Sequence, residues 1–275
     1  MGLARRPIPG YGAVPKPVLG GGCGVLKVDG SPASDEAPPA SLPPSLLAHA
    51  LGNLLAERMA DGSKGFAINQ LCAALVDASP EAGVAYVDRL LDCGVSVQSL
   101  YDTYIPRAAQ QLGEMWSDDT MSFSDVTLGM SRLTEIFRRL SPTFLKSGER
   151  GNHSRRALFA LTPGESHSLG IAMAADYFQK GGWAVRVELR ADASELARIA
   201  SRHEFDMIGL SAATRRAIPQ AAETVQALRG VIRPGVPIVL GGPLATYEKT
   251  AAEQIGADMA TTAAVLALME VEKGF

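Results

Sequence analysis

The stretch ALFALTPGESHSLG, residues 157–170, decides the fold of the second half of the chain. Its apolar start predicts a short buried strand, and the small residues that follow predict a loop. A helix is expected to begin near Leu169 and Gly170, so the stretch has the form of the first half of a βαβ unit. Ligands bind at the carboxyl end of such strands. The loop carries Glu165 and His167, and an imidazole close to a carboxylate is a pattern for a metal ligand that its neighbour orients.

Further apolar runs follow at the spacing of βαβ units. These are WAVRVEL, DMIGLS and VPIVLGG, and a short fifth strand is expected near Asp258–Ala260. Helical stretches separate the runs, and a last helix is expected over Ala263–Glu270. Apolar strands that alternate with helices predict a parallel, doubly wound sheet. We expect a flavodoxin-like α/β domain of strand order 2-1-3-4-5 over residues 155–273.

The chain before this domain has a helical texture from Leu46 to Leu145. Four or five amphipathic segments with short connections predict an all-α helical bundle over residues 45–146. Gly94 is expected to stop one helix, and Ser122 or Ser124 to cap the last one. Residues 1–44 are rich in proline and glycine and predict a disordered tail.

Composition narrows the classes of protein that fit. The 275 residues are 47% hydrophobic, and the formal net charge of −3 argues against a generally basic nucleic-acid binder. Three cysteines without CxxC spacing argue against a structural zinc site or a disulfide framework. No apolar run reaches the ~18 residues that span a bilayer. The N-terminus also lacks the hydrophobic segment of a secretory signal, so we expect a cytoplasmic protein with no membrane association.

Three loops are expected to meet at the carboxyl edge of the sheet. The first carries Glu165 and His167, the third strand ends near Ser211, and the fourth ends at Gly241 and Gly242. The first and third strands are neighbours at the switch point of the 2-1-3-4-5 order, so His167 and Ser211 are expected to share a pocket. A serine hydrolase is disfavoured because no serine lies in a GxSxG turn. A single-histidine cofactor ligand fits the loops better.

The three loops together resemble the B12-binding domain family, whose pattern is D/E-x-H-x-x-G, then S-x-L/T, then GG. The chain carries this pattern in order, as Glu165-Ser166-His167-Ser168-Leu169-Gly170, Ser211-Ala212-Ala213 and Gly241-Gly242. The resemblance implies that the cofactor is cobalamin, in its hydroxo/aquo or adenosyl form. Two positions depart from the common pattern: Glu165 replaces an aspartate, and Ala213 replaces a larger residue.

The resemblance also implies a role for each loop. His167 would be the lower axial ligand of cobalt, in place of the dimethylbenzimidazole base of the cofactor. Glu165 would hydrogen-bond the other ring nitrogen, and Ser211 would extend that relay. Gly170 and the Gly241–Gly242 pair would line the slot that receives the displaced base.

Trp116 resembles the tryptophan that light-sensing cobalamin regulators carry beneath the upper ligand, on a helical bundle that caps the corrin. The alternative is an aromatic residue in the core of the bundle. Those photoreceptors also carry a Glu-His pair that supplies a second histidine ligand, but Val126 and Thr127 stand there in this chain. Of the other histidines, His203 is expected to end a helix, and His49 and His153 have no matching context.

The combination of tail, bundle and B12-binding domain, without a DNA-binding domain, resembles antirepressors of the AerR/PpaA type. That resemblance implies a light-responsive regulator of photosynthesis genes that acts on a repressor of the CrtJ/PpsR kind and reaches DNA only indirectly. It implies no enzymatic activity of the chain itself. Two alternatives stay open: the corrinoid subunit of a methyltransferase system, and a regulator that binds haem through His167.

Overall fold

The computed structural model describes residues 63–148, 155–248, 250–262 and 270–271 of the chain. The expected tail, the expected helix near residues 46–59, most of the expected last helix, His49 and His153 lie outside these ranges. The described residues form two compact units, which meet in sequence between Ile136 and Phe137. Among the described helices, none is long and apolar enough to cross a membrane.

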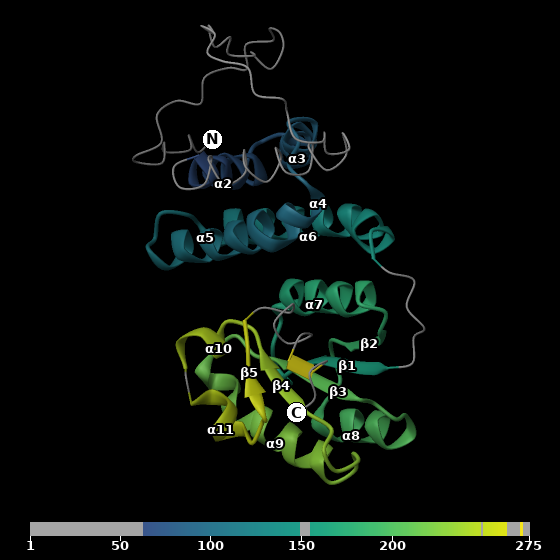
Figure 1. Ribbon diagram of the computed structural model, residues 1–275. Coiled ribbons are helices and arrows are strands. Elements are labelled where there is room, and N and C mark those ends of the chain that lie inside the picture. The colour runs from purple at the N-terminus through teal and green to yellow at the C-terminus, as the bar shows by residue number, and fades with distance from the viewer. Residues whose placement is uncertain (1–62, 149–154, 249, 263–269, 272–275) are drawn as a thin grey trace, which may run out of the picture. The chain divides into compact units, whose positions relative to one another are not determined.

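The first unit is helical, as the sequence predicted (Figure 1). Its described elements are α2 (Ser63–Leu75), α3 (Ala82–Asp92), α4 (Val97–Ser99), the π-helical turn η1 (Leu100–Tyr104), α5 (Ile105–Ser117) and the first part of α6 (Phe123–Lys146). α2 and α5 lie side by side and antiparallel: the Cys72 thiol donates to the Ala108 carbonyl at 3.7 Å, and the Gln111 amide to the Asn69 side chain at 2.6 Å.

Local chemistry sets the ends of these helices. Gly94, at φ +89°, ends α3 in a Schellman motif, in which its N–H donates to the Leu91 carbonyl and the Val95 N–H to the Leu90 carbonyl. Ser122 caps α6, because its hydroxyl accepts the Asp125 N–H at 3.2 Å. The expected glycine stop and serine cap are therefore confirmed.

The second unit contains the parallel sheet. Its strands are β1 (Arg156–Leu161), β2 (Ala184–Glu188), β3 (Met207–Ser211), β4 (Ile238–Gly241) and β5 (Met259–Ala260). They lie in the order β2-β1-β3-β4-β5, and every neighbouring pair is parallel. The predicted fold class and strand order are thus confirmed.

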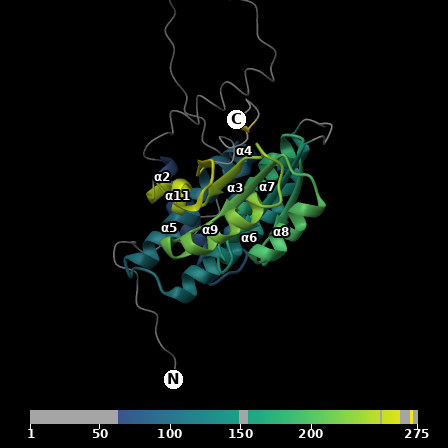
Figure 2. The ribbon, with the colours of Figure 1, turned by 90° about the horizontal axis from the view of Figure 1, so that it is seen from below.

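Helices cover both faces of this sheet. α7 (Ser168–Lys180) lies on one face, and α8 (Ala193–Arg202), α9 (Ile218–Arg229) and α11 (Ala251–Ile255) lie on the other (Figure 1). The view from below shows α8 and α9 together on their side of the strands (Figure 2). The two remaining short elements are η2 (Arg215–Ala217) and α10 (Leu244–Tyr247), which follow β3 and β4. Two separate short helices, α10 and α11, therefore lie between β4 and β5.

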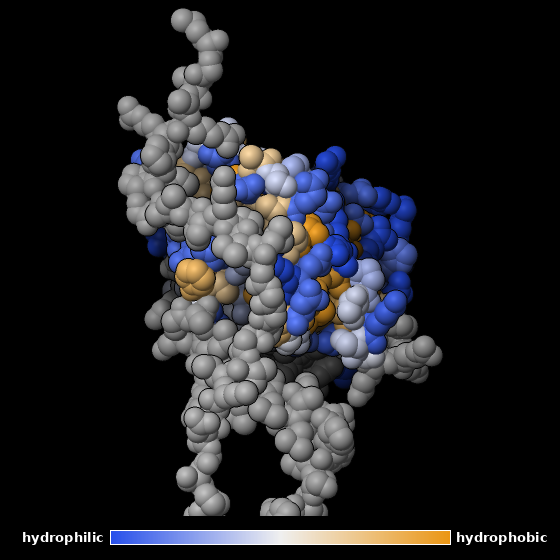
Figure 3. Space-filling view, turned by 90° about the horizontal axis from the view of Figure 1, so that it is seen from above, coloured by the Kyte–Doolittle hydropathy of each residue, from blue (hydrophilic) through white to orange (hydrophobic). Residues whose placement is uncertain are grey.

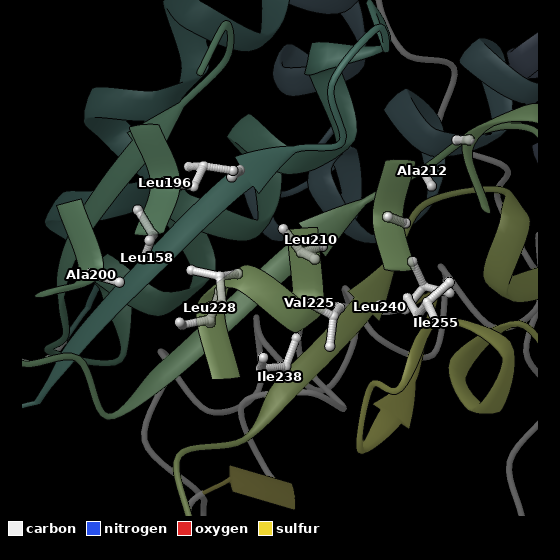
Figure 4. Close-up of a cluster of buried hydrophobic side chains, with 14 of the residues drawn as sticks. Leu158, Leu196, Ala200, Leu210, Ala212, Val225, Leu228, Ile238, Leu240 and Ile255 are labelled. Carbon is white, nitrogen blue, oxygen red and sulfur yellow. The ribbon is translucent and has the colours of Figure 1, made fainter. Parts of the chain in front are cut away.

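Each face of the sheet has its own apolar core. On the α8 and α9 side, Leu158, Leu210, Ile238 and Leu240 point from the strands toward helical residues such as Leu228 (Figure 4). On the α7 side the core is aromatic. Phe178 of α7 contacts Phe159 and Trp183 with ring centroids 5.0 and 5.3 Å apart. Burial of these side chains from both faces explains why the strands read as continuous apolar runs.

The helix α6 contributes to both units. Its last turns belong to the second unit, where the Phe144 ring packs edge-on against Tyr177 of α7 at 5.1 Å and lies 4.2 Å from the Lys180 ammonium. The boundary between the two units therefore falls inside α6. The sequence suggested a boundary after this helix, between residues 146 and 155. The division into a tail, a bundle and a B12-binding domain stays a prediction.

Candidate functional site

A tight turn presents the first candidate residue at the end of β1. The Glu165 N–H donates to the Thr162 carbonyl at 3.0 Å, Pro163 occupies the second position, and Gly164 the third with φ +88°. These features define a type II β-turn, in which the third residue needs a positive φ. The sequence predicted only a loop here, although its Pro-Gly pair is a turn signal.

His167 follows this turn as the N-cap residue of α7. Its Nδ1 atom lies 3.1 Å from Oε2 of Glu165, and its side chain is 65% exposed. A carboxylate accepts hydrogen bonds, so Nδ1 is the protonated nitrogen of the neutral ring. Nε2 is then the nitrogen whose lone pair is available to a metal.

Glu165 is held on both of its oxygens. Oε2 faces His167, and Oε1 accepts the backbone N–H of Ala213 at 3.1 Å. The side chain is only 8% exposed, so it is a well-fixed support for the imidazole. The bond to the segment after β3 comes from the Ala213 amide, and a backbone amide carries no sequence signal. The role of the Ser211 hydroxyl in extending this support stays a prediction.

The ends of β3 and β4 approach each other closely. The Ala212 N–H donates to the Gly241 carbonyl at 3.1 Å, and the Leu244 N–H donates to the Ala212 carbonyl at 3.1 Å. Gly242 has φ +88°, and a Cβ there would lie 2.6 Å from the Ala212 carbonyl oxygen and 2.9 Å from the Ser211 hydroxyl oxygen. Only glycine fits this position, for both reasons. The expected convergence of the three loops is therefore present.

Small residues line the α7 side of the sheet near this edge. Side chains alternate along a strand, and Met207 and Val239 belong to the core on the α7 side. The same alternation puts Gly209, Ser211 and Gly241 on that face. Gly209 lies against Phe159, whose ring would be 2.5 Å from a Cβ at that position. Toward the carboxyl edge, β3 and β4 therefore present little side-chain volume on the α7 side.

The first turn of α7 carries the rest of the pattern. Ser166 is exposed, Ser168 begins the helix, and Leu169 is 8% exposed. Gly170 is exposed, and an added Cβ would meet no described atom within 4 Å. Crowding within the described chain therefore does not explain this helical glycine, which costs about 1 kcal/mol relative to alanine.

Trp116, in the helical unit, is 52% exposed and therefore is not a core aromatic. Its ring centroid lies 6.1 Å from that of Phe123, which is 69% exposed. Sequence reasoning did not single out Phe123. Thr127, at the position of the histidine in the photoreceptor pattern, donates its hydroxyl to the Phe123 carbonyl at 2.7 Å. Apolar side chains also form a band between hydrophilic ones on the face seen in Figure 3.

His203 is the C-cap residue of α8, as expected for a histidine at a helix end. This position gives it a structural explanation that needs no ligand.

Comparisons with known proteins agree with this geometry. Residues 155–271 match the family model described as B12 binding domain. The chain is 27% identical over 176 residues to an uncharacterized 20.5 kDa protein in the bchF-crtJ intergenic region of Rhodobacter capsulatus, covering 64% of this chain and 92% of that protein. It is 26% identical over 158 residues to the HTH-type transcriptional repressor CarH of Myxococcus xanthus, a match that spans 56% of this chain and 50% of CarH.

A solved structure supports the fold. The Methanosarcina barkeri monomethylamine corrinoid protein superposes with a TM-score of 0.60 at 17% identity, over 74% of this chain and 96% of that one. The family match supports corrinoid binding by the α/β unit.

Proposed function

We propose that this chain, whose residues 155–271 match the B12 binding domain family model, binds cobalamin with His167 as the lower axial cobalt ligand and acts as a regulator of transcription. The observation that carries the proposal is the His167–Glu165 pair at the mouth of a B12-binding domain. Glu165 engages Nδ1 and leaves Nε2 to the metal. Such an outer carboxylate fixes the tautomer and raises the basicity of the ligand.

The other residues of the pattern fit the same group. Cobalamin bound through a protein histidine must place its displaced base elsewhere. The small residues Ser211 and Gly241 on the α7 face, and the open flank of Gly170, leave room for such a base. Gly242 has a separate role, because it holds the ends of β3 and β4 together. When bound, adenosylcobalamin supplies a cobalt–carbon bond that light can cleave.

The regulatory part of the proposal draws on the relatives. One relative is described as a protein encoded in a bchF-crtJ intergenic region, and another is named as a transcriptional repressor. We propose that this chain is an antirepressor that binds a repressor of the CrtJ/PpsR kind, with no DNA contact of its own. The cofactor form bound would set the affinity for that partner, because a ligand shifts an equilibrium only by its differential affinity for the two states.

Trp116 is proposed as a contact for the upper side of the cofactor. Its exposed indole, next to the exposed Phe123, offers an apolar surface without a metal ligand. A surface of this kind would favour the cofactor form with the smaller upper ligand, hydroxocobalamin. Trp116→Ala should change the preference between adenosyl- and hydroxocobalamin. It should leave the His167-dependent part of the spectrum unchanged.

The test is a reconstitution in dim light. Adenosyl- and hydroxocobalamin are added separately to the purified full chain, and absorption spectra are taken before and after illumination. We expect binding of at least one form, and light-dependent conversion of bound adenosylcobalamin. Repressor capture that follows the cofactor form would support the antirepressor. Methyl transfer from the bound corrinoid to a thiol would favour a methyltransferase subunit instead, and binding of haem in place of cobalamin would favour a haem regulator.

A further inference from the structure

Thr162 is a buried residue with an unsatisfied hydroxyl. It follows β1 directly and is 1% exposed, and within the described chain its Oγ1 atom has no hydrogen-bond partner. A buried hydroxyl without a partner is destabilising, and replacing it by an apolar group of the same shape is neutral or stabilising. Valine has that shape. Stability of the fold therefore does not explain the hydroxyl at this position.

The backbone of Thr162 is fully engaged. Its N–H donates to the Ser211 carbonyl at 3.0 Å, and its carbonyl accepts the Glu165 N–H at 3.0 Å. Both ends of the turn are thus tied to the end of β3, because the Glu165 carboxylate in turn accepts the Ala213 N–H. Thr162 and Glu165 are the first and last residues of one four-residue turn. The turn that holds the unsatisfied hydroxyl is the turn that presents the support of His167.

Glu165 has the capacity to accept a further hydrogen bond. A carboxylate offers about four acceptor sites, and the Nδ1–H of His167 and the N–H of Ala213 occupy two of them. A hydroxyl donor to a carboxylate makes a short, charge-assisted bond. The Thr162 hydroxyl is buried and has no hydrogen-bond partner within the described chain, so it is a candidate donor for one of the remaining sites.

We propose that Thr162 is a positioning residue of the cofactor site, whose hydroxyl donates to the Glu165 carboxylate when the loop binds a corrinoid. This inference rests on the proposed function. In the bound form Thr162 then supplies a further hydroxyl to Glu165 behind the imidazole, in addition to the Ser211 hydroxyl that the family resemblance implies. The Thr162 hydroxyl is then a hydrogen-bond donor that the bound state uses.

The test compares three variants of the full chain. Thr162→Val removes the hydroxyl and keeps the shape, and Thr162→Ser keeps the hydroxyl. Thr224→Val is the matched control: Thr224 is 0% exposed on α9, and its hydroxyl is already satisfied by the Gln220 carbonyl at 2.7 Å. Melting temperature without ligand, affinity for hydroxocobalamin and the His167-dependent spectrum are measured for each.

We expect Thr162→Val to melt at the same or a higher temperature without ligand, to bind hydroxocobalamin about tenfold more weakly, and to lose part of the His167-dependent spectrum. Thr162→Ser should restore the spectrum, and Thr224→Val should leave it unchanged. In a Glu165→Ala background, Thr162→Val should have no further effect on affinity, because Thr162 acts through Glu165.

Two results would overturn the inference while the proposed function stands. One is binding and a spectrum of Thr162→Val equal to those of the unsubstituted chain. The other is a lower melting temperature of ligand-free Thr162→Val, which would mean that the hydroxyl is already satisfied. Failure of the unsubstituted chain to bind any corrinoid would overturn both the proposed function and this inference.

Discussion

The Nδ1 atom of His167 lies 3.1 Å from Oε2 of Glu165, and the second oxygen of that carboxylate accepts the Ala213 N–H. One nearly buried carboxylate thus joins the loop after β1 to the segment after β3. The same carboxylate fixes which imidazole nitrogen remains available to a metal. The chain builds this arrangement from a type II turn, an N-cap position and one backbone amide.

Glu165→Gln should weaken corrinoid binding. The glutamine keeps the length of the side chain but loses the charge that favours the Nδ1–H tautomer. Loss of an outer carboxylate of this kind costs about 10–100-fold in metal affinity. Titration with hydroxocobalamin measures the change. Glu188→Gln, which removes the carboxylate paired with Arg186 at 2.7 Å on β2, is the control and should bind as the unsubstituted chain does. Equal affinity of both variants would remove Glu165 from the site.

Gly242→Ala should destabilise the α/β unit strongly. The added Cβ would lie 2.6 Å from the Ala212 carbonyl oxygen, at a residue with φ +88°. Gly235→Ala is the matched control, because Gly235 has φ +85° and no described atom within 4 Å of an added Cβ. The control should lose about 1 kcal/mol from backbone strain alone, and Gly242→Ala about 2–4 kcal/mol. Urea unfolding measures both, and equal losses would contradict the close approach of β3 and β4.

Gly170→Ala should affect folding and binding in opposite directions. Alanine favours the helix by up to about 1 kcal/mol, so the ligand-free chain should become more stable. Binding of hydroxocobalamin should weaken, because the methyl group enters the flank that the displaced base needs. Gly113→Ala in α5, which likewise meets no described atom within 4 Å, should stabilise the fold without changing affinity. Unchanged affinity of Gly170→Ala would exclude that flank as part of the slot.

Cys72 should contribute to alkaline unfolding. Burial raises the pKa of its thiol from 9.0 to about 12. Between pH 9 and 12 the unfolded chain therefore loses a proton that the folded chain keeps, so stability falls as pH rises. The slope from one such group is about 1.4 kcal/mol per pH unit. Urea midpoints at pH 8 and pH 10 should converge in Cys72→Ala, and the exposed Cys93→Ala should behave as the unsubstituted chain does.

The α/β unit was predicted well from the sequence, because strands that are buried on both faces consist of continuous apolar runs. The order 2-1-3-4-5 followed from the βαβ pattern and from the rules for doubly wound sheets. The glycine stop after α3 and the serine cap of α6 also had local signals, since a positive φ and an N-cap each favour few residue types.

The candidate site was predicted in part. The pairing of His167 with Glu165 followed from their spacing on one loop. The Ala213 amide could not be predicted, because a backbone donor is the same in every residue. The exposure of Trp116 was also beyond the sequence, since an aromatic residue at a helix end suits the core and the surface equally well. The unsatisfied hydroxyl of Thr162 depends on three-dimensional packing at the end of β1.

The most direct test of the proposed cofactor role is the absorption spectrum of hydroxocobalamin added to the unsubstituted chain and to His167→Ala. We expect the unsubstituted chain to bind the cofactor and to shift its spectrum as histidine replaces the dimethylbenzimidazole base. His167→Ala should bind more weakly and lack that shift. His203→Ala, which removes the C-cap residue of α8, should retain it. An identical spectrum and affinity for the unsubstituted chain and His167→Ala would contradict the assignment of His167 as the cobalt ligand.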